Sequence, residues 1–351
     1  MNDSQKSVKT DAYPNLLPEG YEPVDMSVPF HIAPEHRPAP GEQPILVSFG
    51  AGRDSSAMLV EMYKRGVKPH VIMFADVGNE WPETYKALAT MGRWCASVGF
   101  PPITVVRYVP KKFKHEPYYD LFGNCIANHT LPSMSFGMKG CSLKWKASIM
   151  DKFVSTVCVE TREWLEAGGR CQRLIGYDNG AKDKCRGAVC KDETKWEYVY
   201  PLRTWGLDRE ACGETLLAAG LPLIHKSACV MCASMQIHEL VELAENHPDL
   251  LALAIKLEDR AAPFLEGNMS QEQLDERHEM AICKYTAKLD AYNRGARKSK
   301  PKPPRRKKVG DPGLAKGLWR GGAAGKRDAS KRRPGSWREF CEQHGLLPEG
   351  L

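Results

Sequence analysis

A glycine-rich turn contains the residues with the clearest chemical use. It lies between a short apolar segment and an amphipathic one, with the order Ser-Phe-Gly-Ala-Gly-Arg-Asp-Ser-Ser from Ser48 to Ser56. Glycines let a backbone approach a phosphate closely, and the start of a helix offers unpaired N–H groups to an anion. We therefore predict a phosphate-binding loop, with Gly52 at a positive φ. Its predicted binding residues are Ser48, Gly50, Gly52, Arg53, Asp54, Ser55 and Ser56.

The same turn allows a plainer interpretation. Asp54 or Ser55 would cap the following helix, and the glycines would then only tighten the turn. The turn also lacks the Lys-Ser/Thr ending of a Walker loop and the spacing of a dinucleotide fingerprint. By itself it does not identify a nucleotide.

Cysteines provide a second kind of chemistry. Cys229 and Cys232 form a Cys-x-x-Cys pair, a spacing that sets two thiolates on one side of a tight turn and suits zinc or an iron–sulfur cluster. We take Cys141 and Cys212 as the remaining metal ligands. Reduced thiols at a helix start and a redox dithiol remain alternatives. The other candidate ligands are Cys125, Cys171, Cys185 and Cys190.

Continuous apolar segments predict the elements that position these residues. Residues 45–47, 71–75 and 103–106 are short apolar strands separated by helical patterns. Strands without polar alternation are typical of a parallel sheet covered by helices on both faces, so we predict an α/β fold. The expected organisation is an irregular extension over 1–40, an α/β domain over 41–207, a helical subdomain over 208–293 and a basic, largely disordered tail over 294–351.

Charge is unevenly distributed along the chain. Residues 294–351 contain 17 Lys and Arg against 5 Asp and Glu, although the whole chain has a net charge of only +7. Such a tail either binds a nucleic-acid backbone through its charge or is simply solvated. No apolar run is long enough to span a bilayer, and the N-terminus has no apolar signal-peptide core, so we expect a cytoplasmic protein.

The turn resembles the Ser-Gly-Gly-x-Asp-Ser PP-loop of ATP pyrophosphatases and PAPS reductases. Gly50 and Ala51 depart from that pattern, since they replace its Ser and its first Gly. Residues 74–85, Phe-Ala-Asp-Val-Gly-Asn-Glu-Trp-Pro-Glu-Thr-Tyr, are similar to the Asp-Thr-Gly-x-Glu-x-Pro-Glu-Thr-Tyr stretch of PAPS reductases. The resemblance implies a PP-loop, adenine nucleotide alpha hydrolase-like fold, with Asp76 and Glu80 in the nucleotide pocket.

Two later segments extend the resemblance to roughly residues 44–260, with the boundary uncertainty usual for such matches. The segment Leu-Ile-Gly-Tyr-Asp, which ends at Asp178, and the basic residue Arg186 are similar to a family segment that contacts phosphate or sulfate. A Tyr-Pro-Leu segment beginning at Tyr200, followed by Trp205, matches another. The resemblance favours a [4Fe–4S] cluster over Zn²⁺ in the cysteine site, and ATP or PAPS with Mg²⁺ in the loop.

Three functions compete on this basis. In the first, ATP is split to leave AMP on a substrate oxygen, and sulfur or an amine then displaces AMP, with a nucleobase as one acceptor. In the second, the protein is a PAPS or APS reductase. In the third, it is a non-catalytic nucleotide-binding module that acts on nucleic acid. We assign catalytic roles to Asp54 and Lys144, and to Cys341 as the reductase nucleophile.

Overall fold

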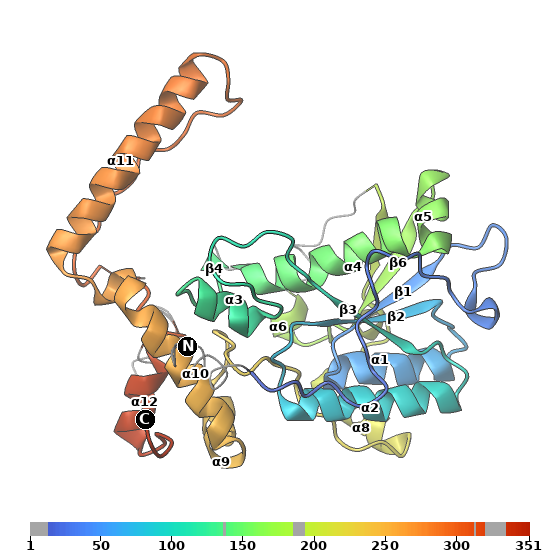
Figure 1. Cartoon of the computed structure of the whole chain (residues 1–351). Coiled ribbons are helices and arrows are strands. Elements are labelled where there is room, and N and C mark those ends of the chain that lie inside the picture. Colours follow the sequence, from blue (N-terminus) through green and yellow to red (C-terminus); the bar gives the residue numbers. More distant parts are fainter. Residues whose placement is uncertain (1–12, 136–137, 185–193, 312–313, 320–334) are drawn as a thin grey trace, which may run out of the picture. The chain divides into compact units, whose positions relative to one another are not determined.

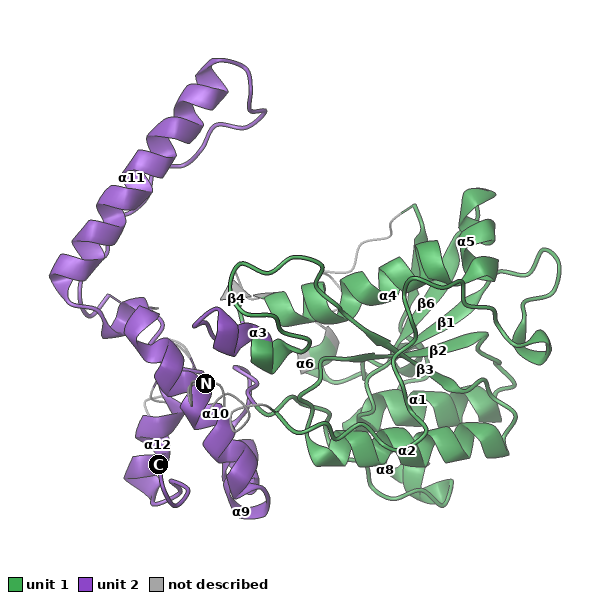
Figure 2. Ribbon diagram, viewed as in Figure 1, with its two compact units in different colours: residues 1–123, 133–230 green, residues 124–132, 231–351 purple. Residues whose placement is uncertain are grey.

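The structure is a computed structural model that describes residues 13–135, 138–184, 194–311, 314–319 and 335–351. The chain divides into two compact units (Figure 2), of which unit 1 contains residues 1–123 and 133–230 and unit 2 contains residues 124–132 and 231–351. No helix among the described residues has the length and apolar character needed to cross a membrane.

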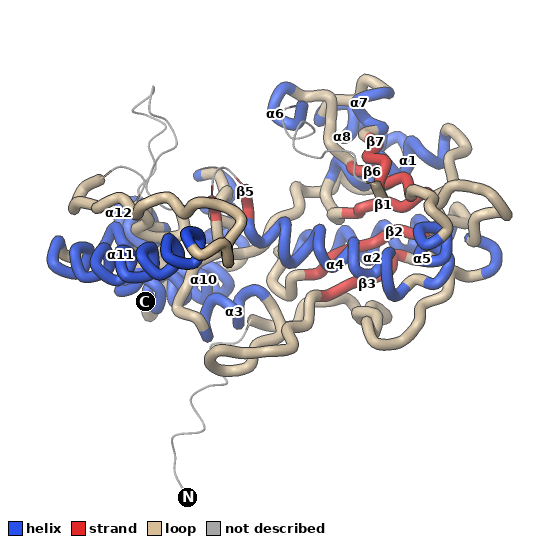
Figure 3. The backbone as a smooth tube through the Cα atoms, turned by 90° about the horizontal axis from the view of Figure 1, so that it is seen from above, coloured by secondary structure: helices blue, strands red, loops and turns tan. Residues whose placement is uncertain are grey.

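Unit 1 is built on a five-stranded parallel sheet in the order β3-β2-β1-β6-β7 (Figure 3). The predicted α/β class is therefore confirmed. Strand order reverses beside β1, and in open α/β sheets ligands bind outside the carboxyl ends of the strands at such a reversal. The strands are β1 Ile45–Phe49, β2 Val71–Asp76, β3 Ile103–Arg107, β6 Cys171–Ile175 and β7 Trp196–Val199.

Helices cover both faces of this sheet (Figure 1). Val47 packs in one apolar core with residues of α1, α2 and α8, whereas its neighbour Leu46 packs in a second core with residues of α4. The alternation explains why β1 and β2 have apolar residues on both of their faces. The helices of unit 1 are α1 Arg53–Lys64, α2 Pro82–Ser97, α4 Ser148–Lys152, α5 Val159–Glu166, α6 Ala181–Lys184, α7 Pro201–Thr204 and α8 Arg209–Ala218, and α3 Leu121–Ala127 spans the boundary between the units.

The boundaries between the units differ from the expected ones. We expected the helical part to begin at 208, but α8 belongs to unit 1 because it packs against α1, and Thr215 donates a hydrogen bond of 3.4 Å to Glu61. The described part of the N-terminal extension, residues 13–40, is irregular apart from the 3₁₀ turn Pro34–His36, and its Val24 N donates to Val105 O of unit 1 at 2.9 Å. Further short elements are β4 Met134–Ser135, β5 Met138–Lys139 and the π-helical turns Ser142–Ala147 and Phe153–Val157.

Unit 2 is helical, and its C-terminal part is more ordered than predicted. The carboxylate of Glu258, which is 2% exposed, accepts hydrogen bonds from the backbone N–H groups of Leu318, Trp337 and Arg338 and from the Ser336 hydroxyl. These bonds fix the last helix to α10 in the region where we predicted a disordered tail. Its elements are α9 Ile237–Asn246, α10 Pro248–Ala261, α11 Gln271–Asn293, α12 Trp337–His344 and the 3₁₀ turns Ala262–Phe264 and Glu266–Asn268.

Candidate functional site

The predicted phosphate loop joins the end of β1 to the start of α1. The hydroxyl of Ser55 accepts from the N–H groups of Gly50 and Gly52 at 3.3 Å each, and it donates to the Gly52 carbonyl at 3.1 Å. The expected positive φ of Gly52 is wrong, because its φ is −110°. The left-handed residue is instead Ala51, at a φ of 52°.

Gly52 is needed for a different reason, a close approach by a later segment. A Cβ at this position would lie 2.9 Å from Ser227 Oγ and 3.0 Å from Ser227 N. The neighbouring Arg53 donates from its backbone N to His225 O and from its side-chain Nε to Ile224 O, both at 3.2 Å. Residues 224–230 therefore lie directly against the loop.

The same segment continues to the residues that follow β2. Trp81 N donates to Ala228 O, and Val230 N donates to Asn79 O, both at 2.9 Å. A β-bridge places Cys229 opposite Glu80. One stretch of chain thus runs along the carboxyl edge of the sheet, by which we mean the ends of β1, β2 and β6 with the loops that follow them, and it joins two segments predicted to bind the nucleotide.

Three carboxylates meet beside the loop. One oxygen from each of Asp54, Asp178 and Asp183 lies within 4.8 Å of the others. Their meeting depends on Gly176, where an added Cβ would lie 2.7 Å from Ser55 Cα, so the end of β6 rests on the backbone of α1. The sequence analysis missed Asp183, which lies five residues after Asp178, whereas Arg186 lies outside the described residues.

The surroundings of Asp54 raise the pKa of its carboxyl group. Burial is the main cause that raises the pKa of Asp54 to about 6, with Asp178 and Asp183 adding to the rise. Arg209, whose Nη1 lies 3.6 Å from Asp54 Oδ2, opposes it. Three carboxylates at this separation repel one another, and a divalent cation with oxygen ligands would relieve the repulsion.

Asp76 and Glu80 are both fully buried but have different surroundings. Asp76 accepts from Tyr85 OH at 2.9 Å and from Gly78 N at 2.8 Å, and it pairs with Arg107. It is therefore satisfied within the protein and positions the turn. Glu80 pairs through Oε1 with Lys146 Nζ at 2.6 Å, and its Oε2 has no hydrogen-bond partner among the described residues.

Lys146, and not Lys144 two residues before it, contacts Glu80 at the carboxyl edge. Lys144, predicted to be catalytic, is exposed, and its Nζ lies 5.1 Å from the centre of the Tyr108 ring. Burial lowers the pKa of Lys146, but the Glu80 carboxylate, followed by Cys229 and Cys141, raises it above its ordinary value. The π-helical turn over 142–147, which sequence periodicity does not reveal, brings Lys146 rather than Lys144 to the site.

The cysteines divide into two groups. Cys141 and Cys229 are partly exposed, and both raise the pKa of Lys146. Cys232 follows three residues after Cys229 and belongs to unit 2. Cys212 is instead fully buried in an apolar core of unit 1, where burial is the main cause that raises its pKa to about 12. Because Cys212 packs among apolar side chains, we expect it to lie outside the ligand set.

Other cysteines named from the sequence also lie in packed surroundings. Cys171 and Cys125 are buried, and Cys185 and Cys190 lie outside the described residues. Cys341 is fully buried on α12 in unit 2, and burial raises its pKa to about 11. A reductase needs a mobile, reactive thiolate, and the surroundings of Cys341 oppose that role.

Several buried polar atoms along the carboxyl edge have no hydrogen-bond partner among the described residues. A buried donor or acceptor without a partner is destabilising by about 1–3 kcal/mol, so a set of them indicates places for a ligand or for water. The atoms are Asp54 Oδ1, Ser56 Oγ, both amide atoms of Asn79, Glu80 Oε2 and Thr84 Oγ1.

No protein-family model and no curated protein sequence matches the chain. Among solved structures, the chain is similar to the U34-tRNA thiolase NcsA from Methanococcus maripaludis with its [4Fe-4S] cluster, at 15% identity and a TM-score of 0.32. The match covers 64% of this chain and 73% of that chain. A likeness of this degree carries no argument about activity.

Proposed function

We propose that the carboxyl edge of unit 1 binds an adenine nucleotide with Mg²⁺, and that the protein is a PAPS reductase-like PP-loop enzyme that adenylylates its substrate. The observation that carries the proposal is the meeting of Asp54, Asp178 and Asp183 within 4.8 Å at a glycine-rich strand-to-helix turn. This turn lies where the strand order reverses, the place at which such sheets bind nucleotides.

Each part of the edge has a role in this chemistry. The start of α1 and the loop N–H groups would hold the phosphates, and Ser56 Oγ is buried there without a partner among the described residues. The three carboxylates would hold Mg²⁺, which neutralises phosphate charge. A substrate oxygen would attack the α-phosphorus, the bond to the β-phosphate would break, and pyrophosphate would leave with loop donors stabilising its charge.

The adenylylated substrate would then react with a nucleophile, which we propose to be sulfur. Cys141 and Cys229, both next to Lys146 in unit 1, would provide thiolates for an iron–sulfur cluster, because a nearby ammonium favours thiolates. Such a cluster supplies sulfur or redox chemistry when bound, whereas zinc would make the site structural. The basic C-terminal region makes a nucleobase the acceptor that we favour.

The reductase alternative has no support from the thiol that it requires. Cys341 is 0% exposed and packs within unit 2, and the ring of Phe340 beside it lies 4.2 Å from that of His344. Sulfite release from PAPS would need Cys341 to leave this packing and ionise. We therefore rank adenylylation first.

Calorimetric titration with ATP and Mg²⁺ tests the proposal. Asp54→Asn and Asp178→Asn should each weaken Mg²⁺-dependent binding by tenfold or more, since a hydrogen bond or contact to a charged group is worth about 1.5–3 kcal/mol. Glu163→Gln, an exposed carboxylate on α5, makes the same charge change and should leave binding unchanged. Wild-type affinity in folded Asp54→Asn and Asp178→Asn would refute the nucleotide site.

A further inference from the structure

Unit 2 contains a helical segment with almost no core of its own. α11 is 23 residues long, and Leu274 is its single buried residue. Residues 294–311 run back along it (Figure 1), and Gln271 binds this return segment through Nε2 to Lys307 O at 3.2 Å and through Oε1 from Val309 N at 3.0 Å. We call α11 with residues 294–311 the arm. With a single buried residue, α11 leaves most of its surface to solvent.

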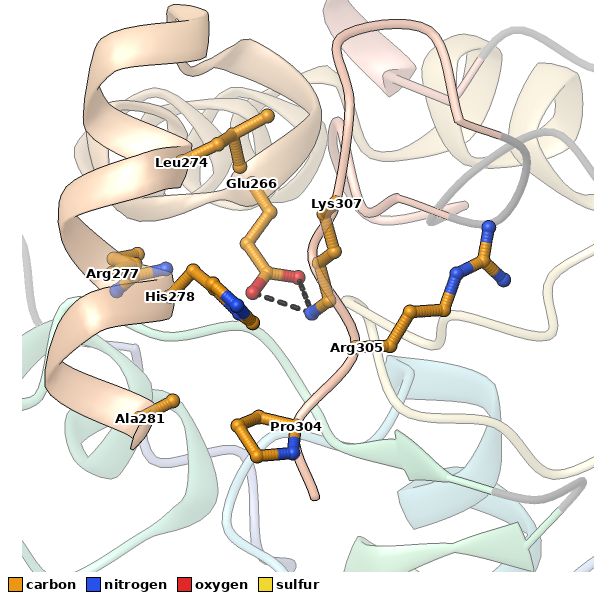
Figure 4. A pocket seen from close by; sticks show the side chains of 8 residues that line it. All are labelled: Glu266, Leu274, Arg277, His278, Ala281, Pro304, Arg305 and Lys307. Carbon is orange, nitrogen blue, oxygen red and sulfur yellow. Dashed lines mark hydrogen bonds and ion pairs between the residues drawn. The ribbon is translucent and has the colours of Figure 1, made fainter. Parts of the chain in front are cut away.

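Ion pairs hold the return segment at the foot of the arm. Lys307 Nζ lies 2.6 Å from both oxygens of Glu266 (Figure 4), and Arg306 donates to both oxygens of Asp275 at 2.8 and 2.7 Å. Arg305 lies 3.5 Å from Asp311. These three cations are therefore largely neutralised by neighbouring carboxylates.

A cavity of about 280 Å³ lies at this foot, between α11 and the return segment (Figure 4). Arg277 and His278 line it from the helix, and the Glu266–Lys307 pair closes one side. That pair is internally neutral, whereas Arg277 forms no ion pair with any described residue. Further cations without carboxylate partners lie along the return segment.

The distal part of the return segment has cations without carboxylate partners. Residues 294–308 include nine Lys and Arg and no Asp or Glu. Lys298, Lys300 and Lys302 are exposed, and none of them forms an ion pair with any described residue.

These features favour one class of partner. A helix that lies on an anionic membrane needs cationic side chains beside its apolar face, whereas Glu272, Glu276 and Glu279 of α11 are exposed. A row of exposed lysines in a segment without helix or strand instead matches a regularly charged polymer, and it contacts backbone phosphates without reading bases. An acidic protein would need a complementary folded surface, whereas a polynucleotide presents its phosphates along any stretch.

We propose that the arm binds the sugar–phosphate backbone of a nucleic acid through Lys298, Lys300 and Lys302, with the ion pairs at its foot holding the row in place. The proposal deepens the nucleic-acid part of the proposed function and locates it on the arm, apart from the ordered α12. The arm has none of the nucleotide-loop residues, so the two proposals can fail separately.

The experiment compares two triple variants of the full chain. Lys298→Ala/Lys300→Ala/Lys302→Ala removes the row, and Lys111→Ala/Lys112→Ala/Lys114→Ala removes three exposed lysines of unit 1 as a matched control. Binding of a fluorescent 20-base-pair duplex and of a 20-nucleotide single strand is measured by anisotropy between 50 and 200 mM salt, and folding is checked by circular dichroism.

The salt dependence decides the outcome. Loss of three duplex phosphate contacts should reduce the slope of log affinity against log salt by roughly 2–3, and the control should keep the wild-type slope. An equal slope for wild type and arm variant would overturn the proposal, as would a wild type that binds neither nucleic acid. ATP titration of the same samples tests the nucleotide site separately: retained ATP binding with no nucleic-acid binding refutes only the arm, and the reverse refutes only the nucleotide site.

Discussion

The carboxyl edge of unit 1 and the arm of unit 2, the two anion-binding regions that we propose, are built in opposite ways. The edge is assembled from segments far apart in sequence, in contact so close that Gly52 and Gly176 leave no room for a Cβ. The arm comes from one contiguous stretch, in which Leu274 is the single buried residue of α11. The edge should therefore depend on single atoms, and the arm on summed charge.

The two regions also differ in how their charges are balanced. At the edge, Asp54 and Glu80 each have a buried oxygen without a partner among the described residues, so each carboxylate keeps an acceptor that a ligand or water would satisfy. On the arm, carboxylates already balance the cations at the foot, and water solvates the rest. Salt should therefore weaken anion binding strongly at the arm and only slightly at the edge.

The largest effect that we predict comes from a single methyl group added at the carboxyl edge. Gly176→Ala would place a Cβ 2.7 Å from Ser55 Cα and 2.9 Å from Ser55 N, atoms of a helix backbone that cannot turn aside. Overpacking of this kind is destabilising by about 1–3 kcal/mol. We expect that loss in urea unfolding, together with loss of ATP binding in calorimetry, because α1 and the loop must shift.

Gly50→Ala, in the loop between β1 and α1, is the matched control. Its added Cβ would have ordinary contacts, at 3.6 Å from Ser227 Oγ and 3.8 Å from Ser55 Oγ. It should unfold at nearly the wild-type urea concentration. If both variants were equally stable, the close approach of β6 to α1 would not be what holds the edge together.

A second prediction separates the two groups of cysteines within unit 1. Cys229→Ser should lose the bound metal, because Cys229 lies next to Lys146 and Glu80. Cys212→Ser should keep the metal but lose stability by about 1–3 kcal/mol, since it places a hydroxyl in an apolar core. Iron and zinc analysis with visible absorption after anaerobic purification measures the first effect, and urea unfolding measures the second. If the Cys212→Ser variant lost the metal but kept wild-type stability, Cys212 would be a metal ligand after all.

Much of the fold was accessible from sequence because buried parallel strands leave a simple signal. The apolar segments at 45–47, 71–75 and 103–106 became β1, β2 and β3, and the segment over 173–176 overlaps β6. The strand β7 was missed, since three of its four residues are only partly buried and its pattern is not apolar throughout. The order of the C-terminal region was missed because it depends on one distant carboxylate, that of Glu258.

The site was less predictable, because its geometry arises from contacts between distant segments. The loop and the segment after β2 were located by their residue types. Asp183 and Lys146 were not, since one meets Asp54 only through the packing of β6 on α1, and the other is turned inward by a π-helical turn. The φ of Gly52 was assigned wrongly because the residue type allows it, while Ser227 gives the actual reason for a glycine.

The smallest effect that we predict concerns the residue that does take the left-handed conformation. Ala51, at a φ of 52°, stands where the resembled PP-loop has a glycine, and its Cβ is strained there by about 1–2 kcal/mol. Ala51→Gly removes this strain but adds freedom to the unfolded chain, which offsets roughly 0.5–1 kcal/mol. We therefore expect a gain of about 0.5–1 kcal/mol in the free energy of unfolding and a melting temperature about 2 °C higher. ATP affinity should stay within twofold, since the loop and the carboxylates keep their places.

Because Ala51 is only 1% exposed, the Ala51→Gly variant also removes a buried methyl group. A loss of stability greater than about 1 kcal/mol would mean that this methyl group contributes more to packing than the left-handed backbone takes away, and the edge would then depend on filled space more than on backbone freedom.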